Sequence, residues 1–301
     1  MQSTLGWLVP FHGASRIISL NETFEQKMNA NRHDVASNLV KTYVPWLFFN
    51  ESKPLPPALF DPAQVCNRLV VQNEYLTILA QFLREGECEF GVFGLSNSGM
   101  NVFTNIACKE PNAEVFFEEA KDLLFSAVPE FQKLFLNIVK LIIPLEIKDK
   151  ENSPIAGFSS HLCQGAIFLS TPVIDRKYWR AELAIDLAHE LAHQVLNLFQ
   201  RTDNLLLSDL YMPIYSGVRR INRPAIMALH GAAALSYILL SAKSIEQCSQ
   251  ANSEEVEYAR QLLNGVREDL LKTLSSLESS CQFSTVGNLI MSDLKTIARL
   301  V

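Results

Sequence analysis

The feature that most constrains this chain is the pattern H-E-x-x-H, which runs from His189 to His193. It lies within an amphipathic helical pattern that extends from about residue 180 to residue 200. Because residues four apart on a helix lie one turn above each other, these two histidines can present imidazole nitrogens to one metal ion. Glu190 then lies beside the metal rather than on it. The pattern predicts a metal-binding helix; the alternative is a pair of histidines in a helical core.

Composition argues against two classes of partner. The chain has 301 residues, a net charge of −6 and no run of basic residues, so it is a poor candidate for binding nucleic acid. The most apolar stretch, residues 225–240, contains a histidine and is too short for a convincing membrane span. Residues 1–10 lack a secretory pattern, and the six cysteines lie far apart without C-x-x-C. We therefore expect reduced thiols and a cytoplasmic protein.

Helical periodicity dominates the sequence and predicts an α+β fold that is mainly helical. We expect a small β-sheet packed beside the HExxH helix, with strands near residues 143–147 and 164–170 and a further short strand near 89–94. Residues 1–20 are expected to form an irregular arm and residues 201–224 a loop. The expected helices cover residues 20–46 in two parts, 62–85, 113–145 with a break at Pro129, 180–200, 225–243, 252–275 and 285–300.

The sequence also suggests two regions. Residues 1–110 form an N-terminal helical region whose role the sequence does not define, and residues 111–301 carry the metal site. A single continuous domain is the alternative, since a chain of this length fits either arrangement.

Two histidines do not complete a metal site, so the identity of the third ligand separates the enzyme classes. The extended pattern H-E-x-x-H-x-x-G-x-x-H fails, because Leu196 replaces the glycine and Phe199 the last histidine. A glutamate on a following helix is also missing, since the first one after His193 is Glu246.

The remaining candidates are His230, Asp203 and Asp209, with His161 less favoured. His230 lies inside an apolar helical pattern among small residues that allow close approach to another element. A lone histidine in such a pattern is usually a core residue. Beside an H-E-x-x-H motif without another good third ligand, we favour His230 as that ligand.

Three arginines precede His230 in the chain, at Arg219, Arg220 and Arg223. They could form a solvated basic loop. However, the segment leads directly into the favoured third ligand, and a guanidinium fork near a metal is well suited to hold the distal carboxylate of a dicarboxylate ligand.

At these positions the sequence resembles the α-ketoglutarate-HExxH type of peptide β-hydroxylases, which modify ribosomally made peptides. The resemblance covers about residues 110–245 and rests on the motif at 189–193, Tyr215-Ser216 followed by Arg219, Arg223-Pro224, and Leu229-His230-Gly231. Gly217-Val218 and Ile221-Asn222 differ from the residues usual in the family. These differences affect the expected substrate more than the chemistry.

The resemblance implies a set of cofactors and roles. Fe(II) would be held by His189, His193 and His230, and 2-oxoglutarate would chelate the metal. Arg219 or Arg223 would pair with the far carboxylate of 2-oxoglutarate, and Tyr215 would belong to the same cosubstrate site. The reaction implied is O2-dependent hydroxylation of a side-chain β-carbon in a precursor peptide. Glu190 would then orient a ligand or water.

Two other hypotheses remain open. In a zinc-dependent HExxH metallopeptidase, Glu190 would be the general base that deprotonates metal-bound water. In a helical partner-binding protein without catalysis, the histidine cluster would bind no metal in stoichiometric amounts.

Overall fold

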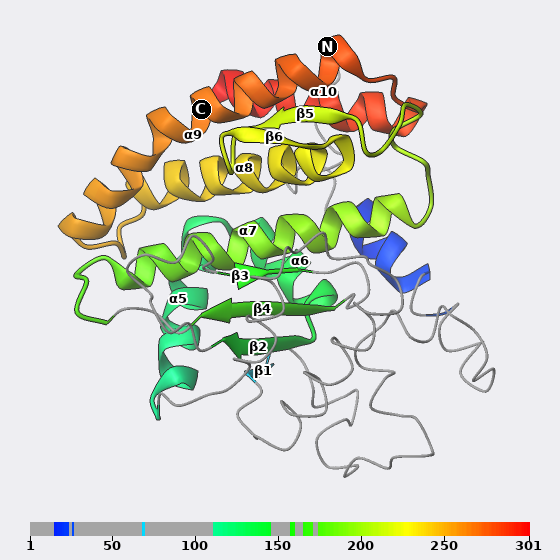
Figure 1. Ribbon diagram of the computed structural model, residues 1–301. Coiled ribbons are helices and arrows are strands. Elements are labelled where there is room, and N and C mark those ends of the chain that lie inside the picture. Colours follow the sequence, from blue (N-terminus) through cyan, green and yellow to red (C-terminus); the bar gives the residue numbers. More distant parts are fainter. Residues whose placement is uncertain are drawn as a thin grey trace.

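The computed structural model describes residues 15–23, 26, 68–69, 111–145, 157–159, 165–170 and 174–301. This part is mainly helical with a small sheet, which confirms the expected α+β class (Figure 1). Residues 15–23 are also helical, so the irregular arm predicted for residues 1–20 is wrong from residue 15 on. The long helices are α5 (Ala113–Ala127), α6 (Pro129–Ile138), α7 (Trp179–Gln200), α8 (Ala225–Glu246), α9 (Ser253–Ser280) and α10 (Thr285–Leu300).

A four-stranded sheet lies beside α7, as expected. Its order is β1 (Arg68–Leu69), β2 (Leu141–Leu145), β4 (Ala166–Ser170), β3 (Gly157–Phe158). Strand β2 pairs in parallel with β1 and β4, whereas β3 pairs antiparallel with β4 at the edge. All five residues of β2 and four of β4 are buried, which explains their continuous apolar sequences.

The helix predicted for residues 62–85 is wrong at residues 68–69, which form strand β1. The local sequence Arg68-Leu69-Val70-Val71 is a short apolar run, and such a run fits a strand as well as a buried helix segment. Pairing of Arg68 and Leu69 with Leu141 and Ile142 decides in favour of the strand. β1 thus brings residues from the first 110 into the sheet that supports α7.

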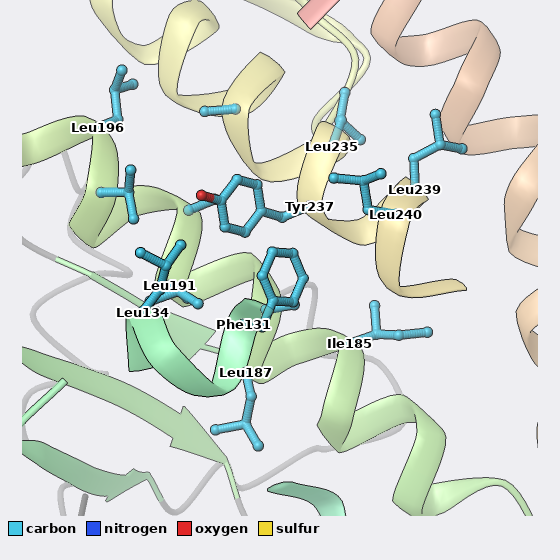
Figure 2. Packing of buried hydrophobic residues seen from close by; sticks show 14 of the residues in the cluster. Phe131, Leu134, Ile185, Leu187, Leu191, Leu196, Leu235, Tyr237, Leu239 and Leu240 are labelled. Atoms are coloured by element: carbon cyan, nitrogen blue, oxygen red, sulfur yellow. The ribbon is translucent and has the colours of Figure 1, made fainter. Parts of the chain in front are cut away.

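Helices α7 and α8 lie side by side between the sheet and the outer helices α9 and α10 (Figure 1). α8 is apolar and buried on nearly all sides, because α7 and α9 cover it from opposite directions. Figure 2 shows Phe131 of α6 facing Tyr237 of α8 beside Leu191 of α7; the two rings stack with centroids 4.7 Å apart. This packing fixes the relative position of the three helices.

Of the described helices, only α8 is long and apolar enough to cross a membrane by length and composition. However, 78% of its most apolar window is buried inside the protein. This burial is consistent with the core helix of a soluble protein.

The loop predicted for residues 201–224 is wrong over its second half, which forms a β-hairpin. Strand β5 (Pro213–Ser216) pairs antiparallel with β6 (Ile221–Pro224). Each strand is only four residues long, and a proline lies at the outer end of each. The segment between them also lacks a two-residue hairpin turn signal. The alternation of apolar and polar residues was therefore too short to identify the strands from the sequence. The hairpin carries all three arginines of the segment.

The remaining predictions fall into two groups. The break between α5 and α6, the bounds of α7, α8 and α10, and strand β4 agree with the sequence to within a few residues. The helix predicted to continue to residue 145 is wrong over its last part, because α6 ends at Ile138 and residues 141–145 form β2, which begins two residues earlier than expected. Helix α9 extends to Ser280, five residues beyond its predicted end. The predicted helix within residues 32–46, the strand near 89–94 and His161 lie outside the described residues. The division into two regions stays a prediction.

Candidate metal centre

The structure brings His189, His193 and His230 together between α7 and α8. The Nε2 atoms of His189 and His193 lie 3.1 Å apart, as expected for residues one turn apart on α7. His193 Nδ1 lies 3.2 Å from His230 Nδ1 on α8. His230 is followed by Gly231, whose missing side chain leaves space for Ser216 Oγ, 3.0 Å from where a Cβ would stand. Small residues therefore let α8 approach both α7 and the hairpin.

The three imidazoles fit a metal in chemistry and in pairwise separation. Two nitrogens bound to one metal at about 2.0–2.1 Å lie about 3.0–3.4 Å apart, which matches both separations. They do not yet converge on one point, because His193 presents Nε2 to His189 and Nδ1 to His230. Accordingly, no group of three or more His, Cys, Asp or Glu residues within the described part is arranged as a metal site. A metal would require His193 to present one nitrogen toward both neighbours.

Glu190 is buried directly beside the cluster. The residue is 2% exposed, and its Oε1 atom lies 3.8 Å from His189 Nε2, beyond hydrogen-bond distance. A Cβ on Gly157 of β3 would stand 3.0 Å from Oε1, so the strand packs closely against this carboxyl group. The other oxygen, Oε2, is buried without a hydrogen-bond partner among the described residues. An orphaned buried oxygen next to three imidazoles suits a site completed by a metal-bound group or water.

Burial keeps His189 and His193 neutral. Burial, reinforced by the positive charge of Arg219, lowers the pKa of His189 to about 4. Burial lowers the pKa of His193 well below its ordinary value, and the charges of His189, His230 and Arg223 lower it further. Although the His189 side chain keeps 23% of its surface exposed, both groups are unprotonated near neutral pH. Neutral imidazole is the form that binds metals.

Two of the three arginines lie near the histidines. The charge of Arg219 acts on His189 and that of Arg223 on His193, which places one guanidinium near each end of the motif. Arg223 is half-buried, and burial together with the nearby Arg219 lowers its pKa. Within the described residues no carboxylate pairs with Arg223. Two neighbouring guanidinium groups beside the neutral imidazoles of His189 and His193 form a positive site that favours an anion.

Tyr215 and Arg220 are placed differently from these two arginines. Arg223 pairs with Ile214 in the hairpin, so Tyr215, one residue further on, lies on the opposite face. Arg220 has a left-handed φ of 54° and turns toward α9, where its Nη2 atom lies 3.0 Å from Asp269 Oδ2. The structure therefore groups Arg219 and Arg223 with the histidines but not Arg220, and it separates Tyr215 from Arg223.

The two aspartates considered as third ligands have other partners. Asp203 accepts a hydrogen bond from the hydroxyl of Ser284 at the start of α10. Asp209 Oδ1 accepts a hydrogen bond from the Tyr211 backbone N–H at 2.9 Å. His230 is the candidate that the structure places against the motif.

Sequence reasoning missed Gln200, the last residue of α7. Its Oε1 atom lies 3.0 Å from His230 Nε2. The signal was available, because Gln200 lies seven residues after His193 and two helical turns place it on the same face. A polar residue on the same helix face as candidate metal-binding histidines is therefore a candidate hydrogen-bond partner for one of them.

No family model matches the chain, and no curated protein is similar enough to count as a match. The residues and geometry of the site are therefore the basis for assigning a function.

Proposed function

We propose that the chain is an Fe(II)- and 2-oxoglutarate-dependent oxygenase that hydroxylates the β-carbon of a side chain in a ribosomally made precursor peptide. The observation that supports this proposal most strongly is the joint placement of three histidines and two arginines. Such a site has positions for a metal and for an anionic cosubstrate, both of which this chemistry needs.

His189, His193 and His230 would hold the metal. All three are neutral donors, so they leave the charge of a divalent cation uncompensated. An anionic cosubstrate offsets that charge. In the usual two-histidine, one-carboxylate site, the carboxylate side chain of the protein offsets part of it. Among the described residues the candidate third ligand is a histidine rather than a carboxylate, which is consistent with a dianion such as 2-oxoglutarate.

Arg219 and Arg223 would bind the carboxylate of 2-oxoglutarate that lies away from the metal. Arg223 is half-buried, so little water competes for its guanidinium and it can bind a carboxylate strongly, whereas Arg219 is exposed. When bound, Fe(II) with 2-oxoglutarate and O2 supplies the oxidising equivalents: one oxygen atom enters the C–H bond, and the other enters succinate as CO2 is lost.

Glu190 would orient a ligand or a water molecule and help keep bulk water out. Its burial against β3 gives it a fixed position, which is the requirement for such a role. We also place the protein in the cytoplasm, since Cys248 and Cys281 are free thiols in the described part of the chain and precursor peptides of this kind are made there.

A zinc-dependent metallopeptidase is the second candidate, and the position of Glu190 favours it. Its carboxyl group lies next to the first histidine of the motif and beside the edge strand β3, where a general base would act on metal-bound water. The two candidates assign different work to Glu190.

The distinguishing experiment measures succinate formed from 2-oxoglutarate by the full chain with Fe(II), with and without O2. We expect succinate that requires both Fe(II) and O2 and that disappears in His230→Ala. Replacement of Glu190 by Gln should retain metal and 2-oxoglutarate binding. Zinc-dependent cleavage of an unfolded peptide, abolished in Glu190→Gln and accompanied by no succinate formation, would contradict the proposal.

A further inference from the structure

Gln200 connects the two metal-site helices through a single side chain. It ends α7, while His230 lies on α8, and the 3.0 Å contact between Gln200 Oε1 and His230 Nε2 spans the space between them. This contact continues the line of ring nitrogens from His189 through His193 to His230. The amide oxygen of Gln200 thus lies next to the far ring nitrogen of this line, His230 Nε2.

The acceptor at the end of this line determines where each proton lies. An amide oxygen only accepts hydrogen bonds, so His230 must donate through Nε2–H, and its Nδ1 atom then carries a lone pair. The neutral imidazole has one N–H, so the same logic passes along the line. With neutral rings at these separations, His193 would donate from Nδ1 to His230 Nδ1, and His189 would donate from Nε2 to His193 Nε2. One acceptor is sufficient to define a consistent set of tautomers.

We propose that Gln200 is a positioning residue that holds His230 as the Nε2–H tautomer and leaves His230 Nδ1 as its metal-binding nitrogen. The inference rests on the proposed function for the role of the metal. Metal-binding histidines commonly donate their second ring N–H to an oxygen acceptor, which fixes both the tautomer and the ring plane. Gln200 occupies that place for His230.

Stability alone does not explain this glutamine. Its Nε2 atom is buried and has no hydrogen-bond partner among the described residues. A buried amide donor without a partner costs folding free energy, about 1–3 kcal/mol. Gln194, the other glutamine of α7, shows the contrast, because its Oε1 and Nε2 atoms bind the backbone of Gly165 and Ala166 at 2.8 and 2.9 Å. Gln194 ties the helix to the sheet, whereas Gln200 satisfies only the histidine.

The test combines nuclear magnetic resonance with metal titration on the full chain. Long-range ¹⁵N–¹H spectra of metal-free protein labelled with ¹⁵N-histidine report the tautomer of His230. The resonances of His230 are assigned as those that disappear in His230→Gln. Co(II) and Fe(II) titrations then compare wild type, Gln200→Met, Gln200→Glu and the control Gln194→Met.

We expect the Nε2–H tautomer at His230 in wild type and in Gln200→Glu, and its loss in Gln200→Met. Metal affinity should fall about 10–100-fold in Gln200→Met and be retained in Gln200→Glu, which keeps the oxygen acceptor. Gln194→Met should lower the unfolding temperature while leaving the affinity of the folded protein within about threefold of wild type, since it removes hydrogen bonds to the backbone of Gly165 and Ala166 rather than to His230.

The outcomes separate the two proposals. The Nδ1–H tautomer in wild-type protein would overturn the role of Gln200, and this result needs no variant to fold. Unchanged metal affinity in folded Gln200→Met would also overturn it while leaving the proposed function intact. A wild-type protein that binds neither Fe(II) nor Co(II) would contradict the proposed function and with it the role of Gln200 toward a metal.

Discussion

At the scale of single residues, the described part of the site carries positive charge that its own side chains leave uncompensated. His189 and His193 are neutral through burial, and Arg219 and Arg223 add positive charge beside them. Glu190 does not compensate for this charge in the metal-free protein, because burial raises its pKa to about 8. The site as a whole therefore attracts an anion, and the half-buried Arg223 is the residue best placed to bind one.

Replacement of Arg223 by Met should weaken binding of 2-oxoglutarate by a factor of about 10–150. This corresponds to loss of a charge-assisted hydrogen bond of about 1.5–3 kcal/mol while the aliphatic part of the side chain is kept. Isothermal titration calorimetry with 2-oxoglutarate and the metal-loaded protein measures the change. Arg260→Met is the matched control, because Arg260 pairs with Glu246 and Glu257 on the exposed side of α9. If Arg223→Met and Arg260→Met bind 2-oxoglutarate with equal affinity, Arg223 does not bind this cosubstrate.

At the scale of elements, helix α9 holds the arginine hairpin in place. The Gly217 N–H donates to Thr273 Oγ1 at 2.8 Å, and this hydroxyl donates to the Asp269 carbonyl oxygen at 2.7 Å. A Cβ on Gly217 would stand 2.5 Å from that carbonyl oxygen, so the hairpin and the helix meet backbone to backbone. Arg220 adds an exposed ion pair to Asp269. The hairpin therefore presents Arg219 and Arg223 from a fixed support.

Replacement of Gly217 by Ala should displace the hairpin and lower the free energy of unfolding by about 1–3 kcal/mol, the usual cost of overpacking. Binding of 2-oxoglutarate should weaken as well. Gly265→Ala in the same helix α9 is the control, because a Cβ there meets no atom within 4 Å. It should stabilise the protein by about 0.5–1 kcal/mol through helix propensity. Urea denaturation of both variants provides the comparison, and stabilisation by Gly217→Ala would contradict the close contact.

At the scale of the whole molecule, the packing that builds the site also makes stability depend on pH. Helix α7 lies between the sheet and α8, so its polar residues are desolvated. Burial raises the pKa of both Asp186 and Glu190 to about 8, and the nearby carboxyl groups add to the effect. Burial lowers the pKa of His189 to about 4. The carboxyl groups and the histidines thus have opposite effects on how stability changes with pH.

The metal-free protein should lose stability as pH rises from about 6.5 to 8. A carboxyl group with a raised folded pKa stabilises fully below its unfolded pKa near 4, and this contribution disappears as pH rises through 8. A histidine that is buried in its neutral form lowers the stability of the protein only as pH falls below about 6.5. The effects of the carboxyl groups and of the histidines on stability therefore largely cancel between about pH 4.5 and 6.5. Urea denaturation in the presence of a chelator should show that the free energy of unfolding decreases by an amount on the order of 2 kcal/mol between about pH 6.5 and 8.

The control for this prediction is the double replacement Asp186→Asn and Glu190→Gln. It removes both titrating carboxyl groups and should flatten the profile between pH 6.5 and 8. Stability of the wild-type chain that stays constant or increases over the same range would show that these groups are not desolvated as described.

Much of the fold could be predicted from the sequence, because long periodic segments determine their own structure. The apolar spacing of Leu183, Leu187, Leu191 and Val195 is sufficient to define α7 and its buried face. Pro129 separates α5 and α6 as expected. Strand β1 and the hairpin were missed because two- and four-residue strands acquire their structure from partners far away in the chain.

The candidate site was predicted in part. The spacing of His189 and His193 follows from helix geometry, and His230 was found by excluding other ligands. Gln200 was not predicted, because its role depends on how α8 packs against α7. Similarly, only strand pairing reveals that Tyr215 and Arg223 lie on opposite faces of the hairpin. Pairs within one element can be read from the sequence, whereas pairs between elements require the fold.

The most direct test of the oxygenase proposal is anaerobic reconstitution with Fe(II) followed by titration with 2-oxoglutarate. The proposal predicts a visible metal-to-ligand charge-transfer band that is lost in His230→Ala and weakened in Arg219→Ala and Arg223→Ala. The absence of a band, together with tight binding of zinc and cleavage of an unstructured peptide, would contradict the proposal and favour the metallopeptidase.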